Sequence, residues 1–250
     1  MIVTDKFVFV HLPRSGGTFV SDVIRKCFPA AREIGYHLPR LLLPKEFSHL
    51  PVLGTVRNPW EYYVSWFHHQ HAKQKHGPLF SFVTENQTLD FVGTTQNELN
   101  LCINENLDVL LQALPENFNY QERNIPNLTR DVMCKIRGTG SGLYSFRFNQ
   151  MFGPGDGVYF CRVESLRNDL IEFFESIGVA SASLHSCILG LGNKNISAHA
   201  HYSTYYTADL AELVSIRDRQ LIERFGYVFE RASESKMMTK AASTKPHGSS

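Results

Sequence analysis

Two short segments of the sequence combine fixed positive charge with hydroxyl groups and turn residues. The first is the loop His11-Leu-Pro-Arg14-Ser15-Gly-Gly-Thr18, and the second contains Arg57-Asn-Pro followed by Ser65. An arginine guanidinium is permanently charged and presents a planar fork of donors, and serine and threonine hydroxyls add further donors. The chemistry that these segments indicate is recognition of an anion such as phosphate or sulfate.

The first segment lies where a strand should pass into a helix. Residues Lys6 to His11 form a β-branched and aromatic run that ends before Pro13, and a helix is expected from Thr18 to Cys27. Backbone N–H groups of such a turn converge on one point, and the helix adds its positive dipole end. A tight turn with a solvated arginine remains the alternative. The Gly-Lys-Ser/Thr ending of an ATP-binding loop is missing, which disfavours an ordinary NTPase.

The second segment repeats this plan. Residues Pro51 to Arg57 predict a strand, Asn58 is a helix cap, and Pro59 suits the first helical position. Ser65 then lies about two turns into the helix. Arg57 in a structural salt bridge is the alternative here. The apolar face of the helix is formed by Trp60, Tyr63, Val64 and Phe67.

The order and spacing of the two segments resemble those of sulfotransferases that use 3′-phosphoadenosine 5′-phosphosulfate (PAPS). The stretch from Pro13 to Thr18 resembles their 5′-phosphosulfate loop, and Arg57-Asn-Pro with Ser65 resembles their 3′-phosphate segment. The resemblance implies transfer of a sulfuryl group from PAPS to an acceptor hydroxyl, with adenosine 3′,5′-bisphosphate as the product. The cosubstrate would be bound by Arg14, Ser15, Gly16, Gly17, Thr18, Phe19, Arg57 and Ser65.

A catalytic base is expected between the two segments. The sequence Gly35-Tyr-His37-Leu-Pro39 is similar to the His-Leu-Pro segment of cytosolic family members, in which the histidine is the base. An imidazole with an ordinary pKa of about 6.5 is largely neutral at physiological pH. Glu33 is the alternative, alone or paired with His37, because some carbohydrate-directed members use a glutamate in this region. Arg14 replaces a common lysine and is expected to act as a fixed cation on the transferring group.

The remaining elements predict an α/β fold with a parallel sheet. A strand is expected at 158–163 and a helix at 166–177, with helical character at 89–114 and one long helix from Tyr206 to Phe225. The resemblance specifies the fold further as a three-layer parallel sheet flanked by helices, of the P-loop NTPase-like sulfotransferase type.

Composition indicates one domain, at residues 1–231, followed by a disordered tail at 232–250 that is rich in Ser, Lys, Ala and Thr. The 25 Lys and Arg residues nearly balance the 24 Asp and Glu residues, so no overall field attracts nucleic acid. Five scattered cysteines, the lack of a signal peptide and the lack of a long apolar run predict a cytoplasmic protein without a transmembrane segment.

Two groups of histidines raise the question of a metal, but their spacing matches no common zinc module, and no metal is expected. The acceptor is not identified. Resemblance of the C-terminal region, Tyr205 to Leu210 and Arg224 to Phe229, to bacterial members favours a carbohydrate over other small molecules. A kinase-like phosphotransferase and a catalytically silent nucleotide-binding module remain alternatives, and the sequence does not indicate an oligomeric state.

Overall fold

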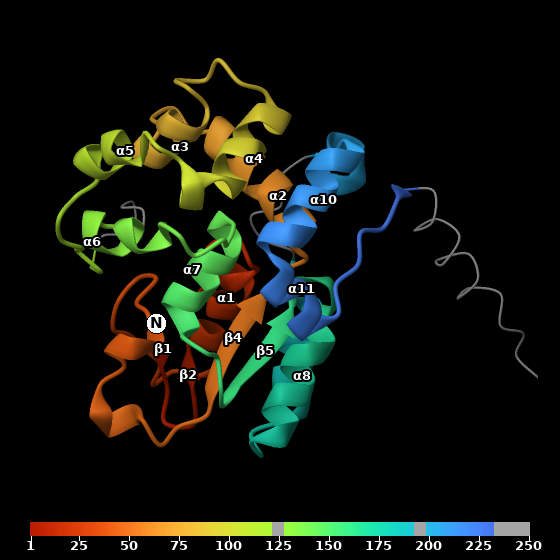
Figure 1. Cartoon of the computed structure of the whole chain (residues 1–250). Coiled ribbons are helices and arrows are strands. Elements are labelled where there is room, and N and C mark those ends of the chain that lie inside the picture. Colours follow the sequence, from red (N-terminus) through yellow and green to blue (C-terminus); the bar gives the residue numbers. More distant parts are fainter. Residues whose placement is uncertain (122–127, 193–198, 233–250) are drawn as a thin grey trace, which may run out of the picture.

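A five-stranded sheet forms the centre of the protein (Figure 1). The structure is a computed structural model that describes residues 1–121, 128–192 and 199–232. The strand order is β3-β1-β2-β4-β5. The strands are β1 (Ile2–Val3), β2 (Val8–Phe9), β3 (Arg32–Glu33), β4 (Val52–Val56) and β5 (Val158–Arg162).

The sheet is mixed: the three strands that the sequence predicts are parallel, and the added strand β1 is antiparallel to its neighbours. β2, β4 and β5 are parallel, whereas β1 runs antiparallel to both β2 and β3. Only a tight turn separates β1 from β2, and Thr4 closes it with hydrogen bonds to the backbone of Lys6 and Phe7. A parallel connection needs a dozen or more residues, so a turn this short allows only an antiparallel hairpin.

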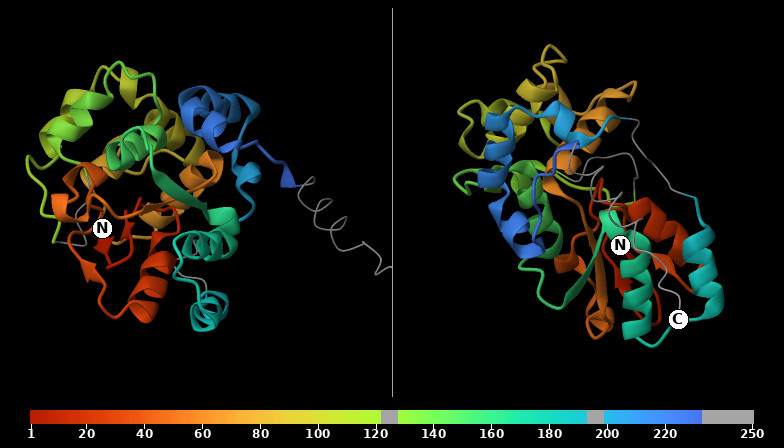
Figure 2. Two further views of the ribbon diagram at one scale, coloured as in Figure 1. Left: turned by 90° about the horizontal axis from the view of Figure 1, so that it is seen from below. Right: turned by 90° about the vertical axis from the view of Figure 1, so that its right-hand side faces the viewer.

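Helices cover both faces of the sheet and give the three layers that the sequence predicts (Figure 2). Phe7 and Phe9 point to the face covered by α1 (Gly17–Cys27), α8 (Leu166–Ser176) and α9 (Ala182–Gly190). Val8 and Val10 belong to the core on the other face. This alternation follows from the two-residue period of side chains along an extended chain.

The second face is covered by a larger set of helices, from which a helical lobe extends beyond the sheet (Figure 1). These helices are α2 (Pro59–His71), α3 (Pro78–Val83), α4 (Phe91–Leu99), α5 (Leu107–Ala113), α6 (Arg130–Met133), α7 (Leu143–Phe152), α10 (Ala208–Arg217) and α11 (Arg219–Phe225). The 3-10 turns are η1 (Arg40–Leu42), η2 (Lys45–Phe47), η3 (Leu101–Ile103), η4 (Cys134–Ile136), η5 (Val163–Ser165) and η6 (Tyr202–Tyr205).

The long helix predicted from Tyr206 to Phe225 is two helices, α10 and α11, separated at Asp218. The buried Asp218 carboxylate accepts hydrogen bonds from the Tyr63 hydroxyl at 2.6 Å and from the Ser145 N–H at 2.9 Å. These contacts with other helices favour a break that the amphipathic pattern does not reveal. The helical stretch predicted at 89–114 is likewise divided, into α4, η3 and α5.

None of the helices in the described part of the chain has the length and apolar character that crossing a bilayer requires. Residues 233–250, which the sequence predicts to be a tail, lie outside the described residues.

A substitution at Gly54 in β4 tests how tightly the aromatic side chains pack against this strand. A Cβ atom at this position would lie 2.8 Å from Cε1 of both Phe152 and Phe160. We expect Gly54→Ala to lower the free energy of unfolding by about 1–3 kcal/mol, because an overpacked core must shift. Urea unfolding monitored by circular dichroism measures the change.

Gly190, the last residue of α9, provides the matched control, because a Cβ atom there would meet no atom of the described residues within 4 Å. We expect Gly190→Ala to be close to neutral. Equal unfolding free energies for the two variants would contradict this account of the packing.

Candidate functional site

The first predicted segment is a turn that leads from β2 into α1. Gly16 caps the helix in the left-handed conformation at φ 76°, and no side chain caps it. Arg14 is also left-handed, at φ 61°. The amides of the first helical turn are therefore not capped by a side chain, which is the arrangement that binds anions at helix N-termini.

His11 and Gly17 fix the path of this turn. A Cβ atom on Gly17 would lie 1.9 Å from Cδ2 of His11, so only glycine fits beside the buried imidazole. The Ser15 side chain is fully buried, and its Oγ lies 3.4 Å from the Tyr144 hydroxyl. The contacts with His11 and Tyr144 therefore hold the loop in place.

The second predicted segment adopts the expected strand-to-helix junction. Arg57 follows β4 directly, Pro59 is the first residue of α2, and the Asn58 side chain accepts a hydrogen bond from the Trp60 N–H at 3.0 Å. The backbone N–H of Asn58 is in turn bound by the Glu164 carboxylate at 2.7 Å. The predicted cap and first helical residue are confirmed.

The two segments meet through their arginines. Arg14 Nη2 donates to Ser65 Oγ at 2.7 Å, although the two residues are 51 positions apart in the chain. Arg57 Nη1 donates to the Arg14 carbonyl at 3.3 Å, and its Nη2 forms an ion pair with Glu61 at 2.6 Å. Three predicted residues, Arg14, Arg57 and Ser65, thus belong to one site at the carboxyl ends of β2 and β4.

The charge of this site is strongly positive. Burial, and next the charge of Arg57, lower the pKa of Arg14 to about 10, so the Arg14 guanidinium remains charged at neutral pH. Two like charges in a partly buried position repel each other, and an anion bound between them relieves that repulsion.

Tyr144 of α7 supports the second segment and was not predicted. Its hydroxyl accepts a hydrogen bond from the Arg57 N–H at 2.8 Å and donates to the Arg57 carbonyl at 3.1 Å. Its ring stacks on Tyr62 with 3.8 Å between the ring centroids. A tyrosine in an aromatic helix gives no local signal of this role, because the contact spans 87 residues of sequence.

The structure places His37 beside the start of the first loop. Its Nδ1 lies 2.8 Å from the His11 carbonyl oxygen, and the two imidazole rings are 4.4 Å apart. A carbonyl oxygen only accepts, so Nδ1 carries the proton and Nε2 carries the lone pair. Burial lowers the pKa of His37 to about 4, an effect that the His11 hydrogen bond partly offsets. The ring is therefore neutral at physiological pH.

Glu33, the alternative base, lies in the edge strand β3. Its carboxylate forms an ion pair with Arg25 of α1 at 2.7 Å. Thr18 lies in the first turn of α1, while the Phe19 ring is buried under the Arg167 guanidinium. The structure thus brings His37 close to the loop and pairs Glu33 with Arg25, where the Glu33 charge offsets a small part of the effect of burial on the pKa of His37.

Three further basic residues surround the site and were also not predicted. Desolvation, and next the charges of Arg14 and Lys73, lower the pKa of His69 to about 4. Partial desolvation and the charges of Arg14 and Arg147 lower the pKa of Lys73. Arg147, on α7, is 6% exposed, and its charge offsets part of the rise that burial causes in the pKa of Tyr62. The sequence does offer one sign of a special role for Arg147, because it is a charged residue between the aromatic residues of α7.

This arrangement can bind a multiply charged anion and can place a neutral imidazole next to it. Within the described residues, no group of three or more potential metal ligands is arranged to hold a metal ion. The groups that the site offers are arginine and lysine cations, backbone amides and the His37 imidazole.

No family model matches the sequence, and no curated protein matches it. Among solved structures, the chain is similar to the mouse sulfotransferase SULT7A1 complexed with PAP, with 13% sequence identity and a TM-score of 0.49. The similarity covers 96% of this chain and 89% of the mouse chain.

The protonation state of His37 can be tested by NMR. We expect the Cε1–H resonance of His37 to titrate with a midpoint near pH 4, because burial disfavours the imidazolium. The ring should thus remain neutral from about pH 5.5 upward. Loss of the resonance in His37→Gln assigns it, and a midpoint close to that of an exposed histidine would contradict the buried neutral ring.

Proposed function

We propose that this protein is a sulfotransferase that moves a sulfuryl group from PAPS to an acceptor hydroxyl. The observation that carries the proposal is the 2.7 Å hydrogen bond from Arg14 to Ser65, which joins the two segments that resemble the phosphosulfate and 3′-phosphate segments of the family. A sulfuryl donor that carries phosphate groups on both the 5′ and the 3′ positions of its ribose needs two such anion sites side by side.

Each segment has a distinct part in binding. The amides of Gly16, Gly17 and Thr18, with the Ser15 and Thr18 hydroxyls, would bind the 5′-phosphosulfate at the start of α1. Arg57 and Ser65 would bind the 3′-phosphate. When the 3′-phosphate of the nucleotide binds the Ser65 hydroxyl, it would replace the hydrogen bond between Ser65 and Arg14. The Arg14 guanidinium would then turn to the transferring group.

The proposed reaction is an in-line displacement at sulfur. His37 Nε2 accepts the proton of the acceptor hydroxyl while the acceptor oxygen forms a bond to sulfur. The bond from sulfur to the bridging phosphate oxygen breaks, and its electron pair leaves with adenosine 3′,5′-bisphosphate. Arg14 stabilises that developing charge as a fixed cation. The charge of bound PAPS would raise the pKa of His37 and make Nε2 a stronger base.

The acceptor, location and extent of the enzyme are part of the same proposal. We infer a carbohydrate or another small hydroxyl compound as acceptor, from the resemblance of the C-terminal region to bacterial family members. Five cysteines without disulfides support a reducing, cytoplasmic location. Residues 1–231 are proposed as one sulfotransferase domain, and the reaction needs no metal.

Nucleotide binding gives the first test. We expect the protein to bind adenosine 3′,5′-bisphosphate, and Arg57→Ala to raise the Kd roughly 10- to 100-fold, because a charge-assisted contact is lost. Calorimetry measures both values. Arg219→Ala is the matched control, since Arg219 lies on the surface and pairs only with Glu223 of its own helix. Equal affinity for magnesium ATP, without any response to the 3′-phosphate, would indicate the kinase-like alternative instead.

Transfer of labelled sulfate from PAPS to a panel of hydroxyl acceptors gives the second test. We expect His37→Gln to lower kcat by about 100-fold or more with little change in the KM for PAPS, because glutamine keeps a donor for the His11 carbonyl but accepts no proton. Glu33→Gln should retain activity. The reverse result would make Glu33 the base, and PAPS binding without any transfer would indicate a silent binding module.

A further inference from the structure

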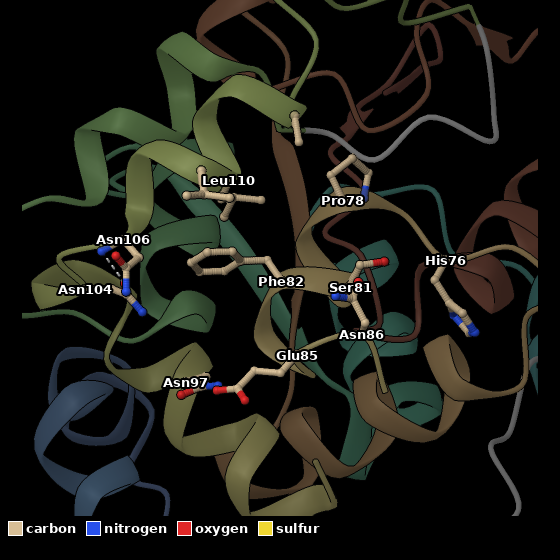
Figure 3. Close-up of a pocket in the computed structure, with 12 residues that line it drawn as sticks. His76, Pro78, Ser81, Phe82, Glu85, Asn86, Asn97, Asn104, Asn106 and Leu110 are labelled. Atoms are coloured by element: carbon tan, nitrogen blue, oxygen red, sulfur yellow. Dashed lines mark hydrogen bonds between the residues drawn. The ribbon is translucent and has the colours of Figure 1, made fainter. Parts of the chain in front are cut away.

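A cavity lies in the helical lobe, among α3, α4 and α5, apart from the cationic site (Figure 3). Its volume is about 690 Å³, which is sufficient for a ligand of several rings. The Phe82 ring points from α3 toward Asn106 and Leu110, while Glu85 and Asn97 lie together at another side (Figure 3). None of these residues belongs to the cationic site.

The cavity is lined by side chains that both donate and accept hydrogen bonds. Four of them are asparagines: Asn86, Asn97, Asn104 and Asn106. The Asn97 amide donates one hydrogen bond to the Val83 carbonyl at 3.0 Å, which leaves its carbonyl oxygen as an acceptor toward the cavity. Asn104 Oδ1 accepts from the Asn106 N–H at 2.8 Å, which leaves the NH₂ group as a donor. Asparagine amides pair with hydroxyl groups in either direction.

The charge of the cavity differs from that of the first site. Among the described residues that line it there is no lysine or arginine and one carboxylate, Glu85, and His76 also lies in the lining. Among the described residues, Nδ1 of His76 is buried and has no hydrogen-bond partner. An anion would meet the Glu85 carboxylate without any fixed cation to compensate, so the lining favours a neutral ligand.

The turn that carries Glu85 and Asn86 is held in an unfavourable backbone conformation. Glu85, Asn86 and Gln87 are all left-handed, at φ 48°, 58° and 70°, and none of them is glycine. The buried Thr84 hydroxyl accepts the Gln87 N–H at 3.0 Å, and the Asn86 N–H is bound by the Ser81 carbonyl at 2.7 Å. Strain of this kind is found where a chain must present particular side chains.

We propose that the cavity among α3, α4 and α5 binds a neutral saccharide, whose hydroxyls pair with the four asparagines and whose apolar face packs on Phe82. The first site binds anions through fixed cations, whereas this one combines amides with an aromatic ring, which suits a polyhydroxylated and uncharged molecule. Helix α2 connects the two sites along the chain. It carries Ser65 of the cationic site and ends at His71, five residues before His76 of the cavity lining. The idea that this saccharide is part of the acceptor rests on the proposed function. Binding of the saccharide to the cavity does not depend on that function.

The full-length chain can be tested against neutral oligosaccharides without any nucleotide. Saturation-transfer NMR with maltotriose, cellotriose and chitotriose is expected to show saturable binding of at least one of them. The double variant Asn86→Gly and Asn106→Ala should raise the Kd by about tenfold or more, since two amide contacts are lost. Glycine at position 86 keeps the left-handed conformation accessible. Asn168→Ala, on the exposed surface of α8, is the matched control and should bind as the parent protein does.

Competition separates this proposal from the first one. Adenosine 3′,5′-bisphosphate should not displace the saccharide, and Arg57→Ala should leave saccharide binding unchanged even where nucleotide binding is lost. Absence of binding to every sugar, equal affinity in the double variant, or displacement by the nucleotide would each overturn the saccharide site. Loss of nucleotide binding alone would overturn only the sulfotransferase proposal.

Discussion

Arg14 and Arg57 are held together at the carboxyl ends of neighbouring parallel strands, where the Arg57 guanidinium donates to the Arg14 carbonyl. Strands β2 and β4 end at the same edge of the sheet, so the residues that follow them must come close together. Ser65 binds one guanidinium, Glu61 binds the other, and the Arg14 carbonyl joins the two. A partly buried pair of like charges is unfavourable by itself, which makes an anion its natural complement.

The rest of the fold keeps these groups in place. Tyr144 holds both backbone groups of Arg57, and the residue after it, Ser145, is bound by the Asp218 carboxylate. Asp218 also binds Tyr63 on α2, the helix that carries Ser65. The break between α10 and α11 is therefore connected, through two short hydrogen-bonded steps, to the position of Arg57.

Buried charge adds to the positive character of the site. Burial raises the pKa of Glu98 well above its ordinary range, and the charge of Arg147 offsets part of that rise. Arg147 lies near it, almost fully buried, and forms no ion pair with a described residue. Its charge instead acts on His37 and Lys73, whose pKa values it helps to lower. The residues that line the cavity in the helical lobe include no lysine or arginine, so the two regions differ in their chemical character.

Local sequence determined the two strand-to-helix junctions and their charged residues. Pro59 and Asn58 start α2 by their own backbone preferences and hydrogen bonds, and Gly16 and Gly17 allow a turn that other residues resist. Only the tertiary structure decided the break at Asp218 and the parts of Tyr144, Arg147 and the asparagine cavity. These depend on contacts between residues far apart in the chain, and such contacts leave no periodic or local pattern in the sequence.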